Sequence, residues 1–448
     1  MELTIDKLVY GGDALARLPA DEHGKGKTVF LPFALPGERV NAHVVEQRPG
    51  FARAVLDNVI APSPQRVEPK CPYFARCGGC HYQHAAYEHE LQTKSDILRE
   101  TLRRTAKIDW TGDIRIHSAE PWGYRNRTRM RIVAGPPASA APFSVGYYQM
   151  GSHELFPVEQ CPISSPLINR ALQTLWELGR SGGLPAGMSE VEFFANAADD
   201  RILLAFFSSQ RAPDDSADAL MSELKAKLPE AAGVLLFELR GMRTQGQARS
   251  PVDDLDSVAE SKPFAFSNEK ALTYETAHAK YRVSGGSFFQ TNRFLTDKLI
   301  ELVTAGRSGS KALDLYAGVG LFASVLAKKF DKVTAVESAP SSSSDLQRNV
   351  PANVGAVQDR TELFLKSSPG LKADLVVVDP PRAGLGEAAA RSLAQVRAPR
   401  ITYVSCNPAT LARDLGVLVA AGWRVDELNL IDLFPQTYHI ESVIQVVR

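Results

Sequence analysis

The sequence predicts a multidomain protein with a small N-terminal β-barrel of the OB-like type, a central α+β domain and a C-terminal α/β domain of the Rossmann-like type. Three observations support this fold class. The chain has 448 residues, which is too long for a single hydrophobic core. Short alternating strand patterns between glycines and prolines fill the first 62 residues. After about residue 266, buried strand patterns alternate with helical patterns. We therefore expect domains at residues 1–62, 63–265 and 266–448.

Composition and charge are those of an ordinary globular protein. Hydrophobic residues make up 44% of the chain and charged residues 23%, and the net charge is zero. Bulk charge therefore gives no support for a nucleic-acid partner, which must rest on local patches. No apolar run approaches the ~20 residues of a membrane helix, and the start of the chain lacks the pattern of a secretory signal. We expect a cytoplasmic protein that contacts no membrane and has no obligate protein partner.

The N-terminal segment alternates apolar and polar residues between turns. Gly11-Gly12 and Pro36-Gly37 supply two of these turns. The pattern predicts a five-stranded barrel over residues 1–62. Barrels of this size often bind RNA, but they also serve as structural caps, so the segment by itself leaves both interpretations open.

Three of the five cysteines fall within ten residues, in CPYFARCGGC. They are Cys71, Cys77 and Cys80, and Cys161 lies far downstream in EQCPI. An odd number of cysteines in a cytosolic chain argues against a disulfide framework. One C-x2-C pair with an outlying third cysteine and a distant fourth fits a single four-thiolate site. Because zinc ribbons usually show two C-x2-C pairs, the spacing favours an iron–sulfur cluster, with zinc as the alternative.

Two basic stretches of the central domain differ in their patterns. Residues 84–107 show apolar positions at helical spacing and predict an amphipathic surface helix, which is available to pack on the C-terminal domain. In WGYRNRTRMR the arginines alternate, so a strand would place them on one face. Such a row can bind phosphates and unpaired bases, or it can pair with acidic residues of a neighbouring strand. The arginines are Arg125, Arg127, Arg129 and Arg131.

The C-terminal domain opens with a Rossmann-like pattern. ALDLYAGVG predicts a strand that ends in a turn with Gly318 and Gly320, and LFASVLAKKF predicts the helix that follows. The next strand, KVTAVE, ends in Glu337, which can bind ribose hydroxyls. The third glycine of the dinucleotide fingerprint is missing, which favours S-adenosylmethionine over NAD. A further apolar strand, ADLVVVD, ends in Asp379.

Cys406 occupies a position that favours chemistry. It follows a buried strand pattern over residues 401–404 and precedes a helix with Asn407 as its cap and Pro408 as its first residue. Open α/β sheets bind ligands at the carboxyl ends of their strands, and a helix N-terminus lowers the pKa of a thiol. A buried, inert cysteine is the alternative. Glu441 lies in a predicted loop between the last two strands.

Taken together, these stretches resemble the RNA uracil-5-methyltransferases, which use S-adenosylmethionine to make 5-methyluridine in ribosomal and transfer RNA. The resemblance covers essentially the whole chain. It implies that the N-terminal barrel is an RNA-binding TRAM domain and that the four early cysteines hold a [4Fe-4S] cluster. The bacterial 23S ribosomal RNA enzymes are the most similar subgroup. The matching stretches are CPYFARCGGC with EQCPI, GSFFQTN, LDLYAGVGLF, AVE, DPPRAG, SCNPATLARDL and FPQTYHIESV.

The resemblance also implies roles for individual residues. Cys406 in SCNPATL matches the nucleophile, and Glu441 in HIESV matches the general base. The chain departs from the family pattern at Ala317, where a cysteine is common, and in a serine-rich segment after Glu337 where a regular helix is expected. The positions that match the cofactor site, together with the two turn glycines, are Gln290, Tyr316, Gly318, Gly320, Glu337 and Asp379.

The implied substrate is RNA, with 23S ribosomal RNA favoured and transfer RNA as the alternative. A catalytically silent RNA-binding homologue is a second hypothesis, which the intact Cys406, Glu441 and Gln290 disfavour. A cytosine-5 RNA methyltransferase is a third. Those enzymes typically pair two cysteines near the site, whereas Cys406 is the only cysteine of this C-terminal domain.

Overall fold

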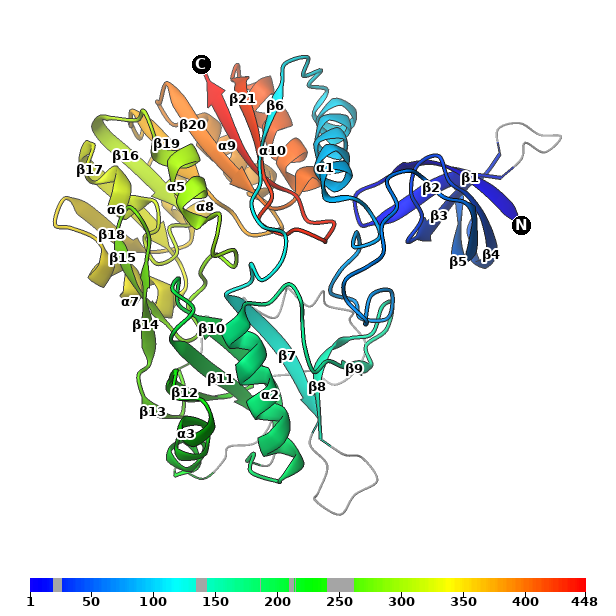
Figure 1. Cartoon of the computed structure of the whole chain (residues 1–448). Helices are drawn as coiled ribbons and strands as arrows, with labels where there is room; N and C mark the ends of the chain where they lie inside the picture. Colours follow the sequence, from blue (N-terminus) through cyan, green and yellow to red (C-terminus); the bar gives the residue numbers. More distant parts are fainter. Residues whose placement is uncertain (19–25, 134–142, 186, 209–212, 214, 240–261) are drawn as a thin grey trace.

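The computed structural model describes residues 1–18, 26–133, 143–185, 187–208, 213, 215–239 and 262–448. A barrel, a central sheet and a C-terminal sheet follow one another along the chain (Figure 1). The polar and acidic composition of residues 253–262 predicts a loop or domain boundary, and this stretch lies outside the described residues, except for Lys262. Among the helices that the structure describes, none is both long and apolar enough to cross a membrane.

The N-terminal segment forms the closed five-stranded barrel that its alternating pattern predicted. Its strands are ordered β1-β2-β3-β5-β4, and β1 alternates buried and exposed positions, with Leu3 and Ile5 inside. Tyr82 and Ala85, from beyond the last strand, complete the barrel core. The strands are β1 (Glu2–Leu8), β2 (Asp13–Arg17), β3 (Thr28–Pro32), β4 (Arg39–Gln47) and β5 (Phe51–Ala61).

The central sheet has its two faces buried in two different cores. Phe193 and Phe206 face a core shared with helices α2 (Pro166–Arg180) and α3 (Ser216–Lys227), while Phe207 faces a core shared with the C-terminal domain. This arrangement explains the continuous apolar runs of its inner strands. The sheet order is β13-β12-β11-β10-β7-β8-β9. The strands are β7 (Arg127–Val133), β8 (Ser144–Tyr148), β9 (Leu155–Pro157), β10 (Met188–Ala195), β11 (Ile202–Ser208), β12 (Ala231–Glu238) and β13 (Ala265–Asn268), and a hairpin of β14 (Ala271–Glu275) and β15 (Lys280–Ser284) follows.

The C-terminal sheet has five parallel strands followed by an antiparallel one, in the order β18-β17-β16-β19-β20-β22-β21-β6. The strands are β16 (Gly309–Leu315), β17 (Phe330–Glu337), β18 (Val354–Gln358), β19 (Leu375–Val378), β20 (Arg400–Ser405), β21 (Arg424–Ile431) and β22 (Glu441–Val447). The helices are α5 (Thr296–Thr304), α6 (Ala323–Leu326), α7 (Pro340–Asn349), α8 (Thr361–Ser367), α9 (Gly386–Ala394) and α10 (Pro408–Ala420).

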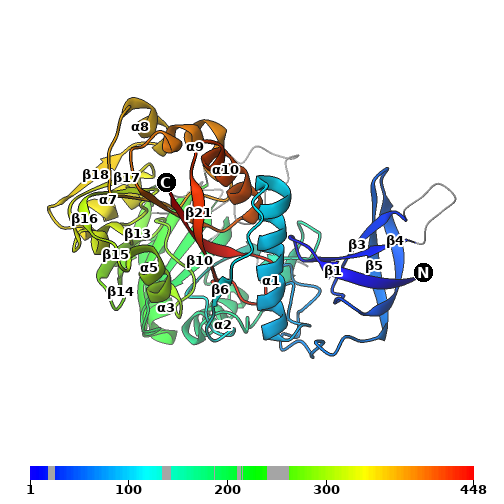
Figure 2. The same cartoon turned by 90° about the horizontal axis from the view of Figure 1, so that it is seen from above.

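Two segments that precede the central sheet pack with the C-terminal sheet. Strand β6 (Ile114–His117) pairs in parallel with β21 and forms the edge of that sheet. Helix α1 (Tyr87–Thr101), continued by a π-helical turn (Leu102–Ala106), lies beside β6 and α10 (Figures 1 and 2). Its buried leucine, Leu98, joins the hydrophobic core of the C-terminal domain.

Three local expectations differ from the structure. The helix predicted over residues 321–330 is limited to α6, because Phe330 already pairs with Gly309 as the start of β17. The serine-rich segment does form a helix, α7. Its buried Asp345 accepts hydrogen bonds from Ser284 and Ser287, which connect α7 to the segment that follows β15. Glu441 is the first residue of β22 and pairs with Ile431, so the loop position predicted for it was wrong.

Candidate functional site

A cavity of about 910 Å³ opens at the carboxyl ends of the C-terminal sheet and extends along the central domain. Ligand-binding sites of open α/β sheets form at these carboxyl ends of the strands. With one exception, Gly320, every site residue predicted from the sequence lines this cavity. These are Cys71, Cys77, Cys80, Arg125, Arg127, Arg129, Arg131, Cys161, Gln290, Tyr316, Gly318, Glu337, Asp379, Cys406 and Glu441.

Cys406 directly follows β20, as its sequence context predicted. Asn407 caps α10, because its side-chain oxygen accepts hydrogen bonds from the N–H groups of Ala409 (3.0 Å) and Thr410 (3.4 Å), and Pro408 begins the helix. The strand therefore ends in a fixed turn that holds the thiol at the cavity wall.

Glu441 and Cys406 lie at the ends of two antiparallel strands. The last pair of β20 and β22 is Ser405 with Ser442, and Cys406 and Glu441 are the residues next to this pair along the chain. After burial, which is the largest cause, the charge of Glu441 raises the pKa of the Cys406 thiol, which places the two groups near each other. The thiol and the carboxyl group are thus neighbours in the cavity, although 35 positions separate them in the sequence.

The charges around Cys406 oppose ionisation of its thiol. Burial is the largest cause and raises the pKa of Cys406 to about 12, with further increases from the negative charges of Glu441 and Asp379. The Arg382 guanidinium acts in the opposite direction. The expectation that the helix N-terminus would lower this pKa was therefore wrong, because desolvation outweighs it.

The two carboxyl groups of this wall are also protonated more readily than in water. Burial, followed by the charge of Asp379, raises the pKa of Glu441 well above its ordinary value, and Arg382 opposes this shift. Burial raises the pKa of Asp379 to about 7. The wall therefore holds three acidic groups whose charged forms burial disfavours, together with one guanidinium.

The sequence reasoning missed Arg382 and His439. The Arg382 Nη2 atom lies 3.2 Å from the His439 Nε2 atom, and both side chains line the cavity. Arg382 directly follows the Asp-Pro-Pro turn and His439 lies two residues before Glu441, so their place beside known candidates was the available signal.

The second end of the cavity is formed by the glycine turn and the strands beside it. The Gly318 N–H donates to Glu337 Oε2 (2.8 Å), and nothing lies within 4 Å of a Cβ atom placed on Gly318. The Tyr316 hydroxyl donates to Glu362 Oε1 (2.8 Å), and Glu362 is a lining residue that the sequence did not suggest. At Gly320 a Cβ atom would lie 2.9 Å from Leu346, so this glycine serves the packing of α7.

The four early cysteines lie on the central-domain wall of the cavity as free thiols. Burial is the main cause that raises the pKa of Cys77 to about 12, and the charge of Cys161 adds to it. Burial also raises the pKa of Cys71 and of Cys80, and the charge of Cys161 raises both pKa values further. Within the described part of the chain, no three His, Cys, Asp or Glu side chains are close enough to hold a single metal ion.

Three of the four alternating arginines pair with glutamates of the neighbouring strand β10. Arg127 pairs with Glu192 (2.6 Å), Arg131 with Glu190 (2.5 Å), and Arg129 also with Glu190. The acidic-partner alternative is therefore what the structure shows for these three.

The fourth arginine, Arg125, lies just before β7, so the expectation of one four-arginine strand face was wrong. Its main chain forms isolated β-bridges with Ser164 and Asn292. It therefore lies where the cysteine segment, the central sheet and the chain before α5 meet.

Comparison with known proteins identifies the family of this chain. The tRNA (uracil-5-)-methyltransferase family profile matches residues 86–360 and 365–448, and the TRAM domain profile matches residues 1–56. An uncharacterized RNA methyltransferase of Aquifex aeolicus is 33% identical over 99% of this chain and 97% of its own length. An uncharacterized RNA methyltransferase of Streptomyces avermitilis is 32% identical over 99% of this chain and 96% of its own length.

A solved structure shares the fold. The Pyrococcus abyssi tRNA (uracil-54, C5)-methyltransferase, solved in complex with S-adenosyl-L-homocysteine, superposes with a TM-score of 0.73 at 22% identity, and the match covers 100% of both chains. The barrel is a TRAM domain, and the chain belongs to the RNA uracil-5-methyltransferase family as an RNA (uracil-5-)-methyltransferase.

Proposed function

We propose that this protein transfers a methyl group from S-adenosylmethionine to C5 of a uridine in RNA, with Cys406 as the nucleophile and Glu441 as the base. The observation that carries the proposal is that Cys406 and Glu441 both line the cavity wall, next to the last residue pair of β20 and β22, Ser405 with Ser442. A nucleophile and a base on adjacent strands can address adjacent atoms, such as C6 and C5 of one uracil ring.

The reaction needs the thiol because C5 of uracil is a poor nucleophile. The Cys406 thiolate adds to C6, the electrons of the C5–C6 double bond move toward C5 and the O4 oxygen, and C5 becomes nucleophilic. C5 then takes the electrophilic methyl group that S-adenosylmethionine supplies, the bond between methyl and sulfur breaks with its electron pair on sulfur, and S-adenosylhomocysteine is the leaving group. Glu441 then removes the proton from C5, the C5–C6 double bond forms again, and the bond between Cys406 and C6 breaks. The target base must leave its stack to reach the thiol.

The glycine-turn end of the cavity fits the cofactor. Gly318 leaves open space where a side chain would project, and Glu337 is fixed by N–H groups of Gly318 and Ala339 (2.7 Å), so its carboxylate is already oriented. Gln290 and Tyr316 line the same cavity as this turn and Cys406. These residues, with Asp379, would hold S-adenosylmethionine, which would supply the methyl group.

The four cavity cysteines fit a [4Fe-4S] cluster, which takes one thiolate per iron. Their donor set is all sulfur, which also suits zinc, the less favoured alternative. Burial disfavours four neighbouring thiolate charges unless cations neutralise them, and a metal group would supply that charge. Iron and zinc analysis with an absorption spectrum of anaerobically purified protein separates the two. Zinc at one equivalent without iron would reject the cluster.

The RNA target is the finer part of the proposal. The resemblance favours 23S ribosomal RNA, whereas the Pyrococcus abyssi protein of the same fold is named for a transfer RNA uridine. Mass mapping of 5-methyluridine in ribosomal and transfer RNA, from strains with and without the gene, decides between them. A lost 5-methyluridine in transfer RNA alone would reject the ribosomal assignment, and a lost 5-methylcytidine would reject uridine chemistry.

Single substitutions test the two catalytic roles. We expect Cys406→Ala to abolish both 5-methyluridine formation and covalent capture of RNA that contains 5-fluorouridine, while binding of S-adenosylhomocysteine persists. Glu441→Gln should leave capture intact and accumulate a methylated covalent adduct, because the C5 proton is no longer removed. Retained covalent capture by Cys406→Ala, or fast turnover by Glu441→Gln, would contradict the assignments.

A further inference from the structure

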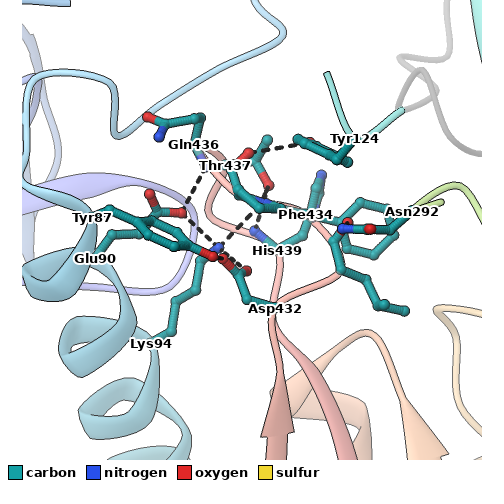
Figure 3. Close-up of polar contacts among 12 residues, drawn as sticks. Tyr87, Glu90, Lys94, Tyr124, Asn292, Asp432, Phe434, Gln436, Thr437 and His439 are labelled. Atoms are coloured by element: carbon teal, nitrogen blue, oxygen red, sulfur yellow. Dashed lines mark hydrogen bonds and ion pairs between the residues drawn. The ribbon is translucent and has the colours of Figure 1, made fainter. Parts of the chain in front are cut away.

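The connection between β21 and β22 contributes Phe434, Tyr438 and His439 to the cavity wall and leads directly into Glu441, the first residue of β22. It runs through residues 432–440. Figure 3 shows that side chains from several other segments converge on this connection. Residues 432–436 begin the stretch of chain that leads to Glu441, which pairs with Ile431 of β21.

Lys94 of helix α1 holds the start of the connection. Its side chain is fully buried, with no exposed surface. The ammonium group donates to Asp432 Oδ1 (2.7 Å), to the main-chain oxygen of Phe434 (3.1 Å) and to Glu90 Oε1 (2.8 Å), as Figure 3 shows. An ammonium has three N–H donors, so all of them are used. The Tyr87 hydroxyl donates to the other oxygen of Asp432 (2.8 Å).

The next main-chain groups are also bonded to other segments. Glu90 Oε1 accepts a second bond from the N–H of Gln436 (2.8 Å), so Lys94 and Gln436 share one carboxylate oxygen. Gln436 has a φ of +68°, which is uncommon for a residue other than glycine. The remaining bonds to main-chain oxygens are Asn292 Nδ2 to Leu433 (3.1 Å), Tyr124 Oη to Pro435 (3.1 Å), and His81 N (2.8 Å) and Tyr82 N (3.1 Å) to Gln436.

Packing alone does not explain a buried ammonium at this position. Desolvating the charge costs several kcal/mol of folding free energy, and an apolar side chain of similar size would pack as well or better. An apolar side chain, however, cannot donate hydrogen bonds to a carboxylate and to a main-chain carbonyl of the same short segment. Lys94 does this at two positions, Asp432 and Phe434, which lie nine and seven residues before Glu441. The side chain thus fixes a direction of the chain as well as filling a volume.

We propose that Lys94 is a positioning residue for the proton-removal step: from helix α1 it fixes residues 432–436 and thereby sets the place of Glu441 near Cys406. This inference rests on the proposed function, because it assigns Lys94 to the step that Glu441 performs. Lys94 touches neither substrate nor cofactor in this role. A displacement of a catalytic group by about 1 Å can slow a reaction about 100-fold, which sets the expected size of the effect.

The test compares Lys94→Met with Lys107→Met in the full-length protein. Lys107 is exposed, lies after the π-helical turn that follows α1, and bonds only the main-chain oxygen of Arg104 (2.9 Å) among the contacts described for its side chain. Methylation is measured with total RNA from a strain that lacks the gene, and covalent adducts are measured by mass spectrometry. We expect Lys94→Met to lower kcat about 100-fold, to leave KM for S-adenosylmethionine within about twofold, and to accumulate a methylated covalent adduct. Lys107→Met should match the wild type.

A second variant covers misfolding. Lys94→Met leaves the buried Asp432 without its cation, whereas Lys94→Met with Asp432→Asn removes both charges and should show the same kinetic signature. Tyr87→Phe, which removes one hydrogen bond to Asp432, should show it in weaker form and decides the matter if neither Lys94 variant folds.

Each outcome is decisive. Wild-type kcat in a folded Lys94 variant, or a loss of kcat without the methylated adduct, would overturn the inference, and for Tyr87→Phe the absence of the adduct would do so. A wild-type protein that makes no 5-methyluridine would reject the proposed function itself.

Discussion

The ionisation of Cys406 gives the most direct test of the cavity's electrostatics. Burial raises the pKa of this thiol to about 12, and the charge of Glu441 is the next largest cause. Replacing Glu441 with Gln removes that charge and keeps the size of the side chain. We therefore expect the pKa of Cys406 to fall in Glu441→Gln, although the same substitution should stop turnover.

The expected magnitude follows from the position of the pKa. An ordinary cysteine titrates near pH 8.5, so a thiol with a pKa of about 12 carries roughly a thousandfold less thiolate at pH 9. Because only the thiolate reacts, alkylation should be slower by about the same factor. Each unit by which Glu441→Gln lowers the pKa should speed alkylation about tenfold at a fixed pH. Arg382→Met removes the cause that favours the thiolate, so it should slow alkylation.

The assay is the pH profile of alkylation by iodoacetamide between pH 7 and 10.5, with the Cys406 peptide quantified by mass spectrometry separately from those of the other four cysteines. The wild-type rate should still be rising at pH 10.5. A plateau below pH 9 in the wild type, or slower alkylation in Glu441→Gln, would refute the assignment of these causes.

Three further predictions concern stability and are checked by thermal unfolding. Asn407→Ala removes the cap of α10 and should cost about 1 kcal/mol, lowering Tm. Arg127→Met leaves the buried Glu192 without its cation and should cost about 3–5 kcal/mol, whereas Arg170→Met, which breaks an exposed pair, should cost less than about 1 kcal/mol; equal losses would contradict the burial argument. Burial raises the pKa of Glu90 from 4.5 to about 7 against the opposing charge of a neighbouring lysine, so the folded state keeps a proton that the unfolded state loses. Tm should therefore fall as pH rises from about 4.5 to 7, and Glu90→Gln should lose that part of the slope.

Local signals made much of the site predictable. Asn407 and Pro408 are sufficient to end a strand and begin a helix, so the place of Cys406 follows from the residues beside it. The glycine turn and Asp379 end parallel strands of one sheet, and the carboxyl ends of such strands meet at one edge. The convergence of these residues on one cavity is therefore a consequence of fold class.

The partners that come from distant segments were not predictable in this way. Arg127 and Arg131 carry a period of two, but nothing in that pattern says that Glu190 and Glu192 would lie on the adjacent strand. The desolvation that raises the pKa of Cys406 depends on the completed cavity, which no local pattern reports. The short helix α6 has a similar origin, because the last residue of the predicted helix, Phe330, pairs with Gly309 of β16 instead.

Strand β6 makes the methyltransferase domain discontinuous along the chain. The chain contributes its edge strand and α1 first, leaves to build the central sheet, and returns for the other strands. The central sheet is thus an inserted body attached by two connections, one after β6 and one after β13, and two attachments restrict its rotation more than a single linker would.

A fragment that starts at residue 266 would contain Cys406, Glu441 and the glycine turn, yet β21 would become an open edge with unpaired N–H and C=O groups. Such an edge is a template for pairing between chains. A fragment that keeps this edge paired must therefore include β6, which lies in the first third of the chain, before the central sheet.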